Sequence, residues 1–346
     1  MVAAPQRILV IRRDNIGDLL CTTPLLSALR ASYPEAWIGV LANSYNAPAL
    51  DGNPDIDEVL VYRKAKHAPA GTSRLSVWLG TLRMLLRLRA MKPDLVIIAS
   101  TGLQATALRF ARFVRPGRIV AYGTPGDGIS DPLPPALATT GHEAEAVMRL
   151  LAPLGLDTTP GPLTLRPNAA VLQALHTRHG TGALAAPRLG IHISARKVPQ
   201  RWPIERFAAA VRALIDAGRF GSVIVFWAPG DENDPQHPGD DRKAAALCAL
   251  MKDLPVCAIA TGSLEELIAG LSLCDAVLCA DGGAMHVAAA LGKPIVCLFG
   301  NSAPERWRPW QVPHVVLQKP SHTVLDISTD EVLDAFSRLT PATDRS

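Results

Sequence analysis

DAVLCADGGAMHVAAALGKPIVCLFG, residues 275–300, is the stretch of the sequence that decides the fold. It predicts a buried strand over Ala276–Ala280, a turn over Asp281–Ala284, a helix over Met285–Leu291 and a second buried strand over Pro294–Phe299. Short apolar runs bounded by Gly, Asp and Pro are typical of parallel strands covered on both faces. The two glycines of the turn remove side chains where the helix begins, so its unpaired N–H groups and the positive end of its dipole can meet an anion. A diphosphate would fit at this turn.

Similar strand and helix patterns recur along the chain on both sides of this unit. Further strands are expected at Ile8–Ile11, Trp37–Ala42, Val59–Tyr62, Asp94–Ala99, Arg118–Tyr122, Leu189–Ile193, Ser222–Trp227 and Cys257–Ala260. Further helices are expected at Asp18–Ser32, Arg74–Lys92, His142–Leu154, Ile204–Ala217, Asp240–Met251 and Thr329–Leu339. Residues 125–141 are too rich in Pro and Gly for regular structure. Asp157–Pro187 holds two Pro/Gly clusters around one short helix, so we place a domain boundary inside it. The pattern therefore predicts an α/β protein with two sheets of similar size.

Composition sets outer limits on the function. The length of 346 residues suits two domains, and 48% hydrophobic against 19% charged residues excludes a disordered chain. A net charge of +4 is too small to argue for nucleic acid and indicates only a mild preference for anionic ligands. The six cysteines form no C-x-x-C pair and mostly fall in apolar patterns, which predicts a reducing cytosol. No window has the roughly 18 uncharged apolar residues of a membrane span, and Ile8–Ile11 is too short for a signal peptide.

The loop after the first strand is the second informative site. It reads RRDNIGD, with Gly17 as its single glycine between Asp14 and Asp18. A dinucleotide-binding loop would have G-x-G-x-x-G here, so nicotinamide-dependent chemistry is disfavoured. Asp18 suits two roles equally: a helix N-cap, or a catalytic carboxylate at the carboxyl end of a parallel strand, where α/β proteins place their ligands.

Two further stretches have a structural and a functional interpretation. Asp55 and Asp57 have the spacing of a metal-binding carboxylate pair, but beside Asn53-Pro54 we interpret them as turn residues and expect no metal. The apolar helix Arg74–Lys92 carries several arginines, and we interpret it as a crossover helix with a basic solvent face. Contact with an anionic membrane surface or acceptor is the alternative.

Three loops at strand ends in the second half suit one anionic ligand. His192–Pro203 carries cations that could neutralise a phosphate leaving group, or it is a solvated loop before a helix. In Trp227–Asp234, Asp231 or Glu232 suits a ribose diol, and a plain acidic turn is equally compatible. In the glycine turn, Asp281 suits sugar hydroxyls and His286 a phosphate, although a lone His on an Ala-rich helix is often structural.

Taken together, these motifs resemble the heptosyltransferase family, family 9 of the glycosyltransferases. The resemblance rests on Gly17-Asp18 followed by L-x-x-T-P-L-L-x-A-L, on N-P-x-I-D at Asn53–Asp57, on R-W-P at Arg201–Pro203 and on the run from Asp281 to Gly300, and it spans nearly the whole chain. It implies a GT-B architecture, with two Rossmann-like domains whose parallel sheets face each other across a cleft. The ranges we expect are 1–168 for an acceptor domain, 169–187 for a linker, 188–322 for a nucleotide-sugar domain and 323–346 for a terminal helix and tail.

The resemblance also implies roles for individual residues. Asp18 matches the catalytic base, and its loop partners on the acceptor side are Arg13, Asn15 and Gly17. The expected donor-binding residues are Ser194, Arg196, Lys197, Gln200, Arg201, Asp231, Glu232, Asp281, Gly282, Gly283, Met285 and His286. The chain departs from the family at Gly282, where Thr or Ser is usual, and at Gln200, where many members have the Lys that holds the diphosphate. We expect Lys197 or Arg196 to replace that lysine.

The implied activity is metal-independent, inverting transfer of a heptose from ADP-heptose to a hydroxyl of the lipopolysaccharide inner core. No cofactor is expected besides this donor. We expect a cytosolic monomer that can contact the inner face of the cytoplasmic membrane and an anionic glycolipid acceptor, with no nucleic-acid partner. Two alternatives stay open: a nucleotide-sugar epimerase or hydrolase, which would turn over donor alone, and a non-catalytic sugar-nucleotide-binding protein.

Overall fold

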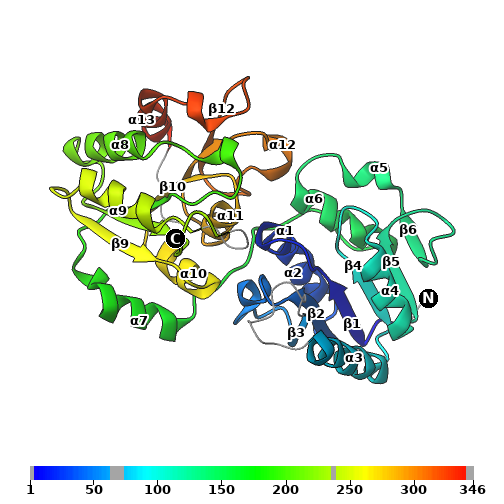
Figure 1. Ribbon diagram of the computed structural model, residues 1–346. Helices are drawn as coiled ribbons and strands as arrows, with labels where there is room; N and C mark the ends of the chain where they lie inside the picture. Colours follow the sequence, from blue (N-terminus) through cyan, green and yellow to red (C-terminus); the bar gives the residue numbers. More distant parts are fainter. Residues whose placement is uncertain (1–3, 63–73, 235–238, 340–346) are drawn as a thin grey trace. The chain divides into compact units, whose positions relative to one another are not determined.

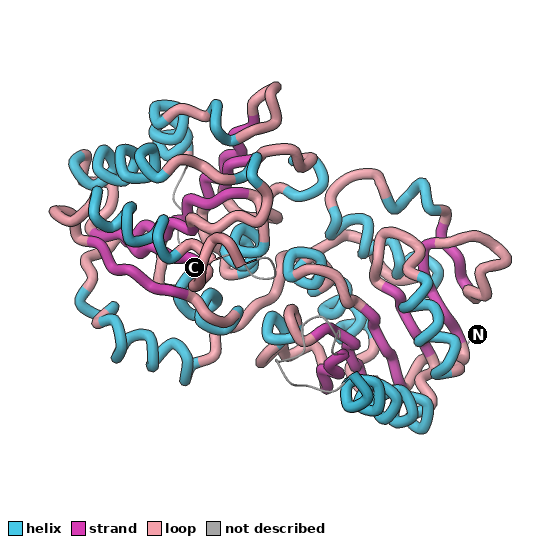
Figure 2. Tube along the Cα trace, in the orientation of Figure 1, coloured by secondary structure: helices cyan, strands magenta, loops and turns pink. Residues whose placement is uncertain are grey.

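The chain folds into two compact units, Met1–Leu165 and Arg166–Ser346. The computed structural model describes residues 4–62, 74–234 and 239–339. Each unit contains one six-stranded sheet in which every described pairing is parallel. Helices cover both faces of each sheet, as Figures 1 and 2 show. The expected pair of α/β sheets of similar size is therefore confirmed.

The sheet of the first unit has the strand order β3-β2-β1-β4-β5-β6. Its strands are β1 Arg7–Ile11, β2 Trp37–Asn43, β3 Glu58–Tyr62, β4 Leu95–Ile98, β5 Arg118–Tyr122 and β6 Asp131–Leu133. Its helices are α1 Ile16–Leu20, α2 Thr23–Ser32, α3 Arg74–Met91, α4 Ala105–Val114, α5 Pro135–Ala138 and α6 Glu143–Met148, with short 3₁₀ turns at Ala47–Leu50 and Arg149–Leu154. Helices α3 and α4 lie side by side, because Arg89 of α3 donates to the carbonyl of Phe113 in α4 at 2.9 Å.

The sheet of the second unit has the order β12-β11-β10-β7-β8-β9. Its strands are β7 Arg188–His192, β8 Ser222–Trp227, β9 Val256–Ala260, β10 Ala276–Ala280, β11 Ile295–Phe299 and β12 His314–Gln318. Its helices are α7 Ala169–His179, α8 Ile204–Asp216, α9 Asp241–Leu250, α10 Leu264–Ser272, α11 Gly283–Ala290, α12 Pro304–Trp307 and α13 Thr329–Arg338. Short 3₁₀ turns lie at Thr181–Ala183, Val198–Gln200 and Val324–Asp326. Helices α8, α9 and α13 pack together, and α7, α10 and α11 form a second group.

The chain reverses its direction of travel across the sheet at one point in each unit. In the first unit this switch point lies between β1 and β4, and in the second it lies between β7 and β10. Loops that follow such neighbouring strands diverge to opposite faces, and ligands of open α/β sheets bind in the crevice between them. The strands themselves supply the core, since Ile8–Val10 and Val277–Cys279 are completely buried. The fold therefore indicates where a functional site can form in each unit.

The expected single helix Asp18–Ser32 is wrong, because two helices occupy this stretch. Helix α1 ends at Leu20 and α2 begins at Thr23. Pro24 lies in the first turn of α2, where its missing N–H breaks no intrahelical bond, whereas inside one continuous helix it would. The first helix also begins two residues before Asp18, with Asn15 at the N-cap position, so Asp18 lies in the first turn.

Residues 125–141 contain more regular structure than their composition predicts. The expectation of none is wrong, because β6 and α5 lie there. Pro132 is tolerated in β6 since this strand forms an edge of the sheet, where one missing N–H removes no inner ladder bond. Pro135 begins α5, a position that suits proline. In the expected linker 169–187, helix α7 groups with the second unit.

Candidate functional site

The loop after β1 places a carboxylate cluster at the switch point of the first unit. Asp18, in the first turn of α1, accepts hydrogen bonds from the backbone N–H of Asn15 at 3.0 Å and from its side-chain amide at 2.9 Å. Its other oxygen accepts from Nη2 of Arg12 at 2.6 Å. The Asp18 side chain is 13% exposed. Its carboxylate is thus fixed in orientation and still accessible.

Arg12 joins both sides of the switch point from a fully buried position. Its Nη1 donates to the carbonyl of Ala99, directly after β4, and its Nη2 donates to Glu143 of α6 at 2.6 Å as well as to Asp18. A third carboxylate, that of Asp14, lies 3.3 Å from its Nε. The side chains of Arg12 and Glu143 are 1% and 0% exposed. One guanidinium therefore organises carboxylates that are far apart in the sequence.

This arrangement keeps Asp18 ionised. Burial by itself raises the pKa of Asp18, but the charge of Arg12 and the hydrogen bonds from Asn15 outweigh burial and hold the pKa below its usual value. Burial likewise lowers the pKa of Arg12, and the surrounding carboxylates, Glu143 foremost, more than reverse this effect. At neutral pH the site therefore holds a carboxylate beside a permanent cation.

The other residues expected on the acceptor side have structural surroundings. The guanidinium of Arg13 lies over the rings of Tyr62 and Phe110, 5.0 and 4.9 Å from their centroids. Asn15 orients Asp18, as described, and Gly17 is buried within α1. The loop thus has two partly exposed carboxylates, Asp14 and Asp18, of which Asp18 is the one that Asn15 orients.

The glycine turn after β10 forms the corresponding site in the second unit. Helix α11 begins at Gly283, two residues earlier than the sequence predicts. A Cβ built on Gly282 would meet no atom within 4 Å, so the turn faces open space. The N–H groups of the first helical turn have no partner within the helix. The turn is therefore accessible to an anion, as an interaction with diphosphate requires.

Gln200 and Asp281 connect the two loops of this switch point. The Gln200 side-chain amide donates to Asp281 at 3.0 Å and to the Ser302 hydroxyl at 3.4 Å. Gly300 directly follows β11, and a Cβ there would lie 2.6 Å from the carbonyl oxygen of Pro199. Only glycine therefore lets the end of β11 approach the loop that carries Gln200 so closely. The neutral Gln200 thus holds the Asp281 carboxylate in place.

The remaining expected residues of the loop after β7 differ in their partners: two bond to the backbone and two are exposed. The Ser194 hydroxyl accepts from the N–H of Ala228 at 2.9 Å and ties this loop to the end of β8. Arg201 donates from Nε to the carbonyl of Ala195 at 3.0 Å. Arg196 and Lys197 are exposed, and within residues 4–62, 74–234 and 239–339 their side chains have no hydrogen bond or ion pair. These two cations are available to a ligand.

Four other expected donor residues engage protein groups. Asp231 accepts from Asn233 at 2.8 Å and 3.0 Å, and Glu232 forms an ion pair with Arg242. Met285 is completely buried, with its sulfur 3.1 Å from that of Cys297, so its side chain belongs to the core. His286 is 4% exposed and packs edge-on against Trp307, with 6.0 Å between ring centroids. For Met285 the structure offers only the backbone N–H to an anion.

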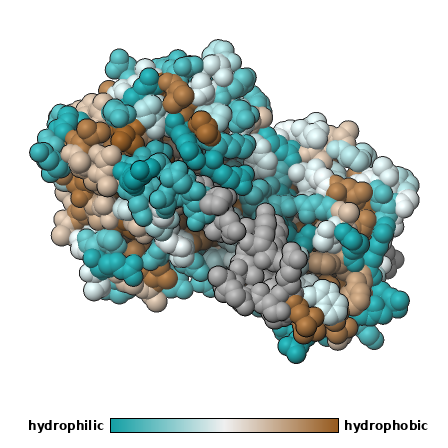
Figure 3. Space-filling model, in the orientation of Figure 1, coloured by the Kyte–Doolittle hydropathy of each residue, from teal (hydrophilic) through white to brown (hydrophobic). Residues whose placement is uncertain are grey.

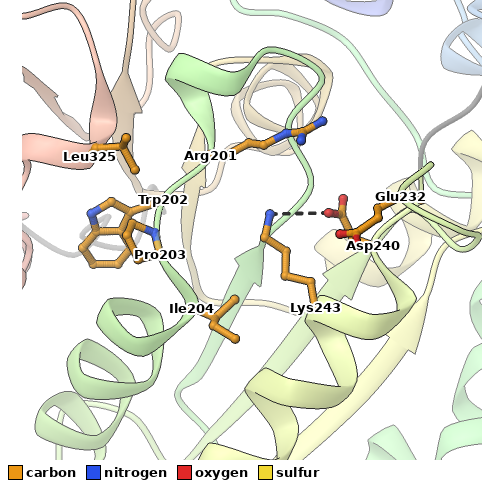
Figure 4. A pocket seen from close by; sticks show the side chains of 9 residues that line it. Arg201, Trp202, Pro203, Ile204, Glu232, Asp240, Lys243 and Leu325 are labelled. Carbon is orange, nitrogen blue, oxygen red and sulfur yellow. Dashed lines mark hydrogen bonds and ion pairs between the residues drawn. The ribbon is translucent and has the colours of Figure 1, made fainter. Parts of the chain in front are cut away.

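A pocket of about 260 Å³ lies beside the loop that follows β7. It is lined by Arg201–Ile204, Glu232, Gly239, Asp240, Lys243 and Leu325. In Figure 4, Lys243 reaches toward Asp240, and their charged atoms are 3.4 Å apart. The glycine turn is not among its lining residues. The volume is below the ~300–1,000 Å³ typical of small-molecule sites. The glycine turn therefore stays the candidate anion site, and this pocket lies outside it.

Sequence reasoning missed Arg12 and Glu143. Arg12 directly follows a strand, which is a usable signal, but Glu143 lies 131 residues away and has no spacing relation to it. Asp55 and Asp57 behave as turn residues: Asp55 accepts from Ser27 at 2.5 Å, and Asp57 accepts from Arg30 at 2.6 Å and from the N–H of Ile38 at 2.7 Å.

A comparison with models of protein families shows to which family the chain belongs. A model of glycosyltransferase family 9 (heptosyltransferase) matches residues 144–329, more than half of the chain. The chain belongs to glycosyltransferase family 9. It is therefore a glycosyltransferase, and the expected family is confirmed.

Known relatives of this family 9 glycosyltransferase agree. The lipopolysaccharide heptosyltransferase 2 of Salmonella typhimurium is 27% identical over 310 residues, 86% of this chain and 84% of the relative. A family 9 glycosyltransferase from Veillonella parvula superposes with a TM-score of 0.78 at 22% identity, over 96% of this chain and 97% of the other. The Escherichia coli heptosyltransferase WaaC with ADP superposes with a TM-score of 0.74 at 17% identity, over 96% and 100%. The GT-B fold class, with two Rossmann-like domains, is confirmed.

Proposed function

We propose that this glycosyltransferase moves a heptose from ADP-heptose to a hydroxyl of the lipopolysaccharide inner core, with inversion at the anomeric carbon and without a metal. Relatives named lipopolysaccharide heptosyltransferases and a neighbouring structure solved with ADP support the donor and the acceptor class. The observation that carries the proposal is the ionised, accessible carboxylate of Asp18, fixed by Arg12 and Asn15.

In the proposed step, Asp18 accepts the proton of the acceptor hydroxyl while that oxygen attacks the anomeric carbon. The new C–O bond forms as the bond from the anomeric carbon to the diphosphate oxygen breaks, and ADP leaves with the bonding electrons. One displacement from the opposite face inverts the centre. The charge of Arg12 keeps Asp18 deprotonated before the reaction and limits its basicity, so Asp18 acts late, as the hydroxyl becomes acidic.

The leaving diphosphate needs stabilisation of its growing negative charge. The N–H groups at Gly282–Ala284 and the positive end of α11 are suited to this role. Arg196 and Lys197 are exposed cations on the neighbouring loop and take the place of the lysine that many relatives have at the position of Gln200. These groups support a reaction without a divalent cation, and we propose that no cofactor besides the donor is needed.

Transfer is tested by measuring ADP release from ADP-heptose, with and without lipopolysaccharide that lacks the outer heptoses. We expect release that depends on the acceptor, persists in EDTA, and gives a product of opposite anomeric configuration by NMR. Asp18→Asn should lower the rate by ~10²- to 10⁴-fold, while Asp157→Asn, an exposed carboxylate of the same unit, should not. Turnover of donor alone would favour an epimerase or hydrolase, and ADP-sugar binding without any turnover would favour a binding protein.

The donor site has its own test. Gly282→Leu would fill the open space at the turn, and Gly182→Leu is the control, since a Cβ there also meets nothing within 4 Å. At a ligand concentration of about 100 times Kd, binding stabilises a protein by about 2.7 kcal/mol. We expect ADP to raise the Tm of the wild type and of the control but not of Gly282→Leu. Equal stabilisation of all three would remove the turn from the site.

A further inference from the structure

Helices α3 and α4 carry an unusual charge pattern. Residues 74–92 hold five cations (Arg74, Arg83, Arg87, Arg89 and Lys92), and residues 105–115 hold three (Arg109, Arg112 and Arg115). Neither stretch contains an aspartate or glutamate, although the whole chain has 35 cationic and 31 anionic residues. The two helices pack together on one face of the first sheet. Eight of the 35 cationic residues therefore lie in two stretches that contain no carboxylate.

Helix α3 also exposes large apolar side chains. Leu75, Trp78, Leu79 and Leu86 of α3 are 63%, 59%, 38% and 50% exposed. Leu75, Leu79 and Leu86 are four and seven residues apart in turn, so they form one stripe along the helix, and Trp78 lies at the edge of this stripe. Leu85 and Leu88 of α3 are buried in the core, and they lie on a different side of the helix from Leu75, Leu79 and Leu86. The outer stripe is thus in addition to what the fold needs.

The arginines beside this stripe are mostly free to meet an external charge. Arg83, Arg87, Arg109 and Arg112 are all exposed. Arg87 is paired with Glu58 at 2.7 Å, the one carboxylate in an ion pair with these two helices among the described residues. Arg109 donates to a carbonyl and a hydroxyl of its own helix, and Arg112 donates to the backbone carbonyl of Asp127, whose carboxylate also interacts with its charge. We call these four arginines and the four apolar residues the α3–α4 surface.

We propose that the α3–α4 surface docks on an anionic lipid bilayer. Cations attract the negative headgroups, and leucine and tryptophan side chains enter the boundary between headgroups and acyl chains, which is how interfacial amphipathic helices bind. No helix in the described part of the chain is long and apolar enough to cross a membrane. In Figure 3, hydrophobic surface lies beside hydrophilic surface where Figure 1 draws α3. Charge complementarity selects lipid over a neutral partner.

The proposal does not depend on the sugar chemistry, so it is tested by binding alone. The full-length protein is sedimented with vesicles of phosphatidylcholine, with or without phosphatidylglycerol. We expect binding to the anionic vesicles only, and weakening by added salt. Leu79→Glu with Leu86→Glu should reduce the partition coefficient about tenfold or more, since each removes a large apolar side chain from the interface. Leu250→Glu, a leucine 45% exposed on α9, is the matched control and should bind as the wild type does.

A second variant keeps the test decisive if the double leucine change disturbs folding. Arg83→Glu with Arg109→Glu alters only exposed side chains and should abolish the preference for anionic vesicles. Equal binding of both variants and wild type, or no binding of the wild type, would overturn the proposal. A wild-type dimer that the leucine variant converts to a monomer, without vesicle binding, would assign the surface to a second copy of the chain instead.

Discussion

The buried pair of Arg12 and Glu143 gives the sharpest test of the first-unit site. Their side chains are 1% and 0% exposed and meet at 2.6 Å. Arg12→Gln leaves Glu143 buried without its cation, and breaking such a pair costs ~3–5 kcal/mol. Glu143→Gln leaves Arg12 with Asp18 and Asp14 and should cost less, ~1.5–3 kcal/mol. The double variant removes both charges, so its cost should fall at least ~2 kcal/mol below the sum of the two single costs.

Amide hydrogen exchange reads this free energy for the first unit alone. At about 1.4 kcal/mol per factor of ten, Arg12→Gln should speed exchange in β1 and β4 from roughly a hundredfold to several thousandfold. Strands β7 and β10 of the second unit serve as an internal reference. Arg212 and Asp253, an exposed pair at 2.7 Å, provide the matched cycle and should show little coupling. If Arg12→Gln changes exchange by less than about tenfold, or if the two cycles show equal coupling, the buried pair does not stabilise the first unit as argued.

Three further outcomes follow from the structure. Because the folded-state pKa of Asp18 is lowered, its stabilisation should be complete above the unfolded pKa of about 3.9 and disappear as pH falls through the folded value, so the stability difference between wild type and Asp18→Asn should shrink below about pH 4 in chemical unfolding. Gly270→Ala should lower stability by ~1–3 kcal/mol, because its Cβ would lie 2.4 Å from the Phe226 ring, whereas Gly182→Ala should not. Cys274, buried and with its pKa raised by that burial to about 12, should resist thiol reagents at pH ~8 until the protein unfolds; rapid labelling of the native protein would contradict this.

Local patterns predicted the elements that are buried on both faces. The strands Ala276–Ala280, Ser222–Trp227 and Arg118–Tyr122 were predicted with the bounds that the structure has. The secondary-structure prediction failed at two prolines. Pro24 lies in the first turn of a new helix instead of within a continuous one, and Pro132 lies in an edge strand where no regular structure was expected. Composition alone does not show whether a proline is tolerated in a helix or strand, because that depends on whether a neighbouring carbonyl would otherwise accept a hydrogen bond from an N–H at its position.

The candidate site was predictable only in part. Asp18 and the glycine turn follow strands directly, so strand ends and glycines indicate them. The bond of Gln200 to Asp281 depends on how two loops of the second sheet meet. The partnership of Arg12 with Glu143 depends on the first sheet bringing β1 and α6 together, which no local pattern encodes.

Helix α7 alters where this chain can be divided. Sequence patterns suggested that residues 169–187 merely join two domains, yet α7 packs on α10 and buries Leu175. A recombinant second half beginning at residue 188 would lack α7 and expose the apolar surface of α10 that α7 covers. A fragment beginning at residue 166 would keep α7 in place. Expression trials of the shorter fragment should accordingly yield aggregates, and only the longer one offers a tractable sample for ligand titrations.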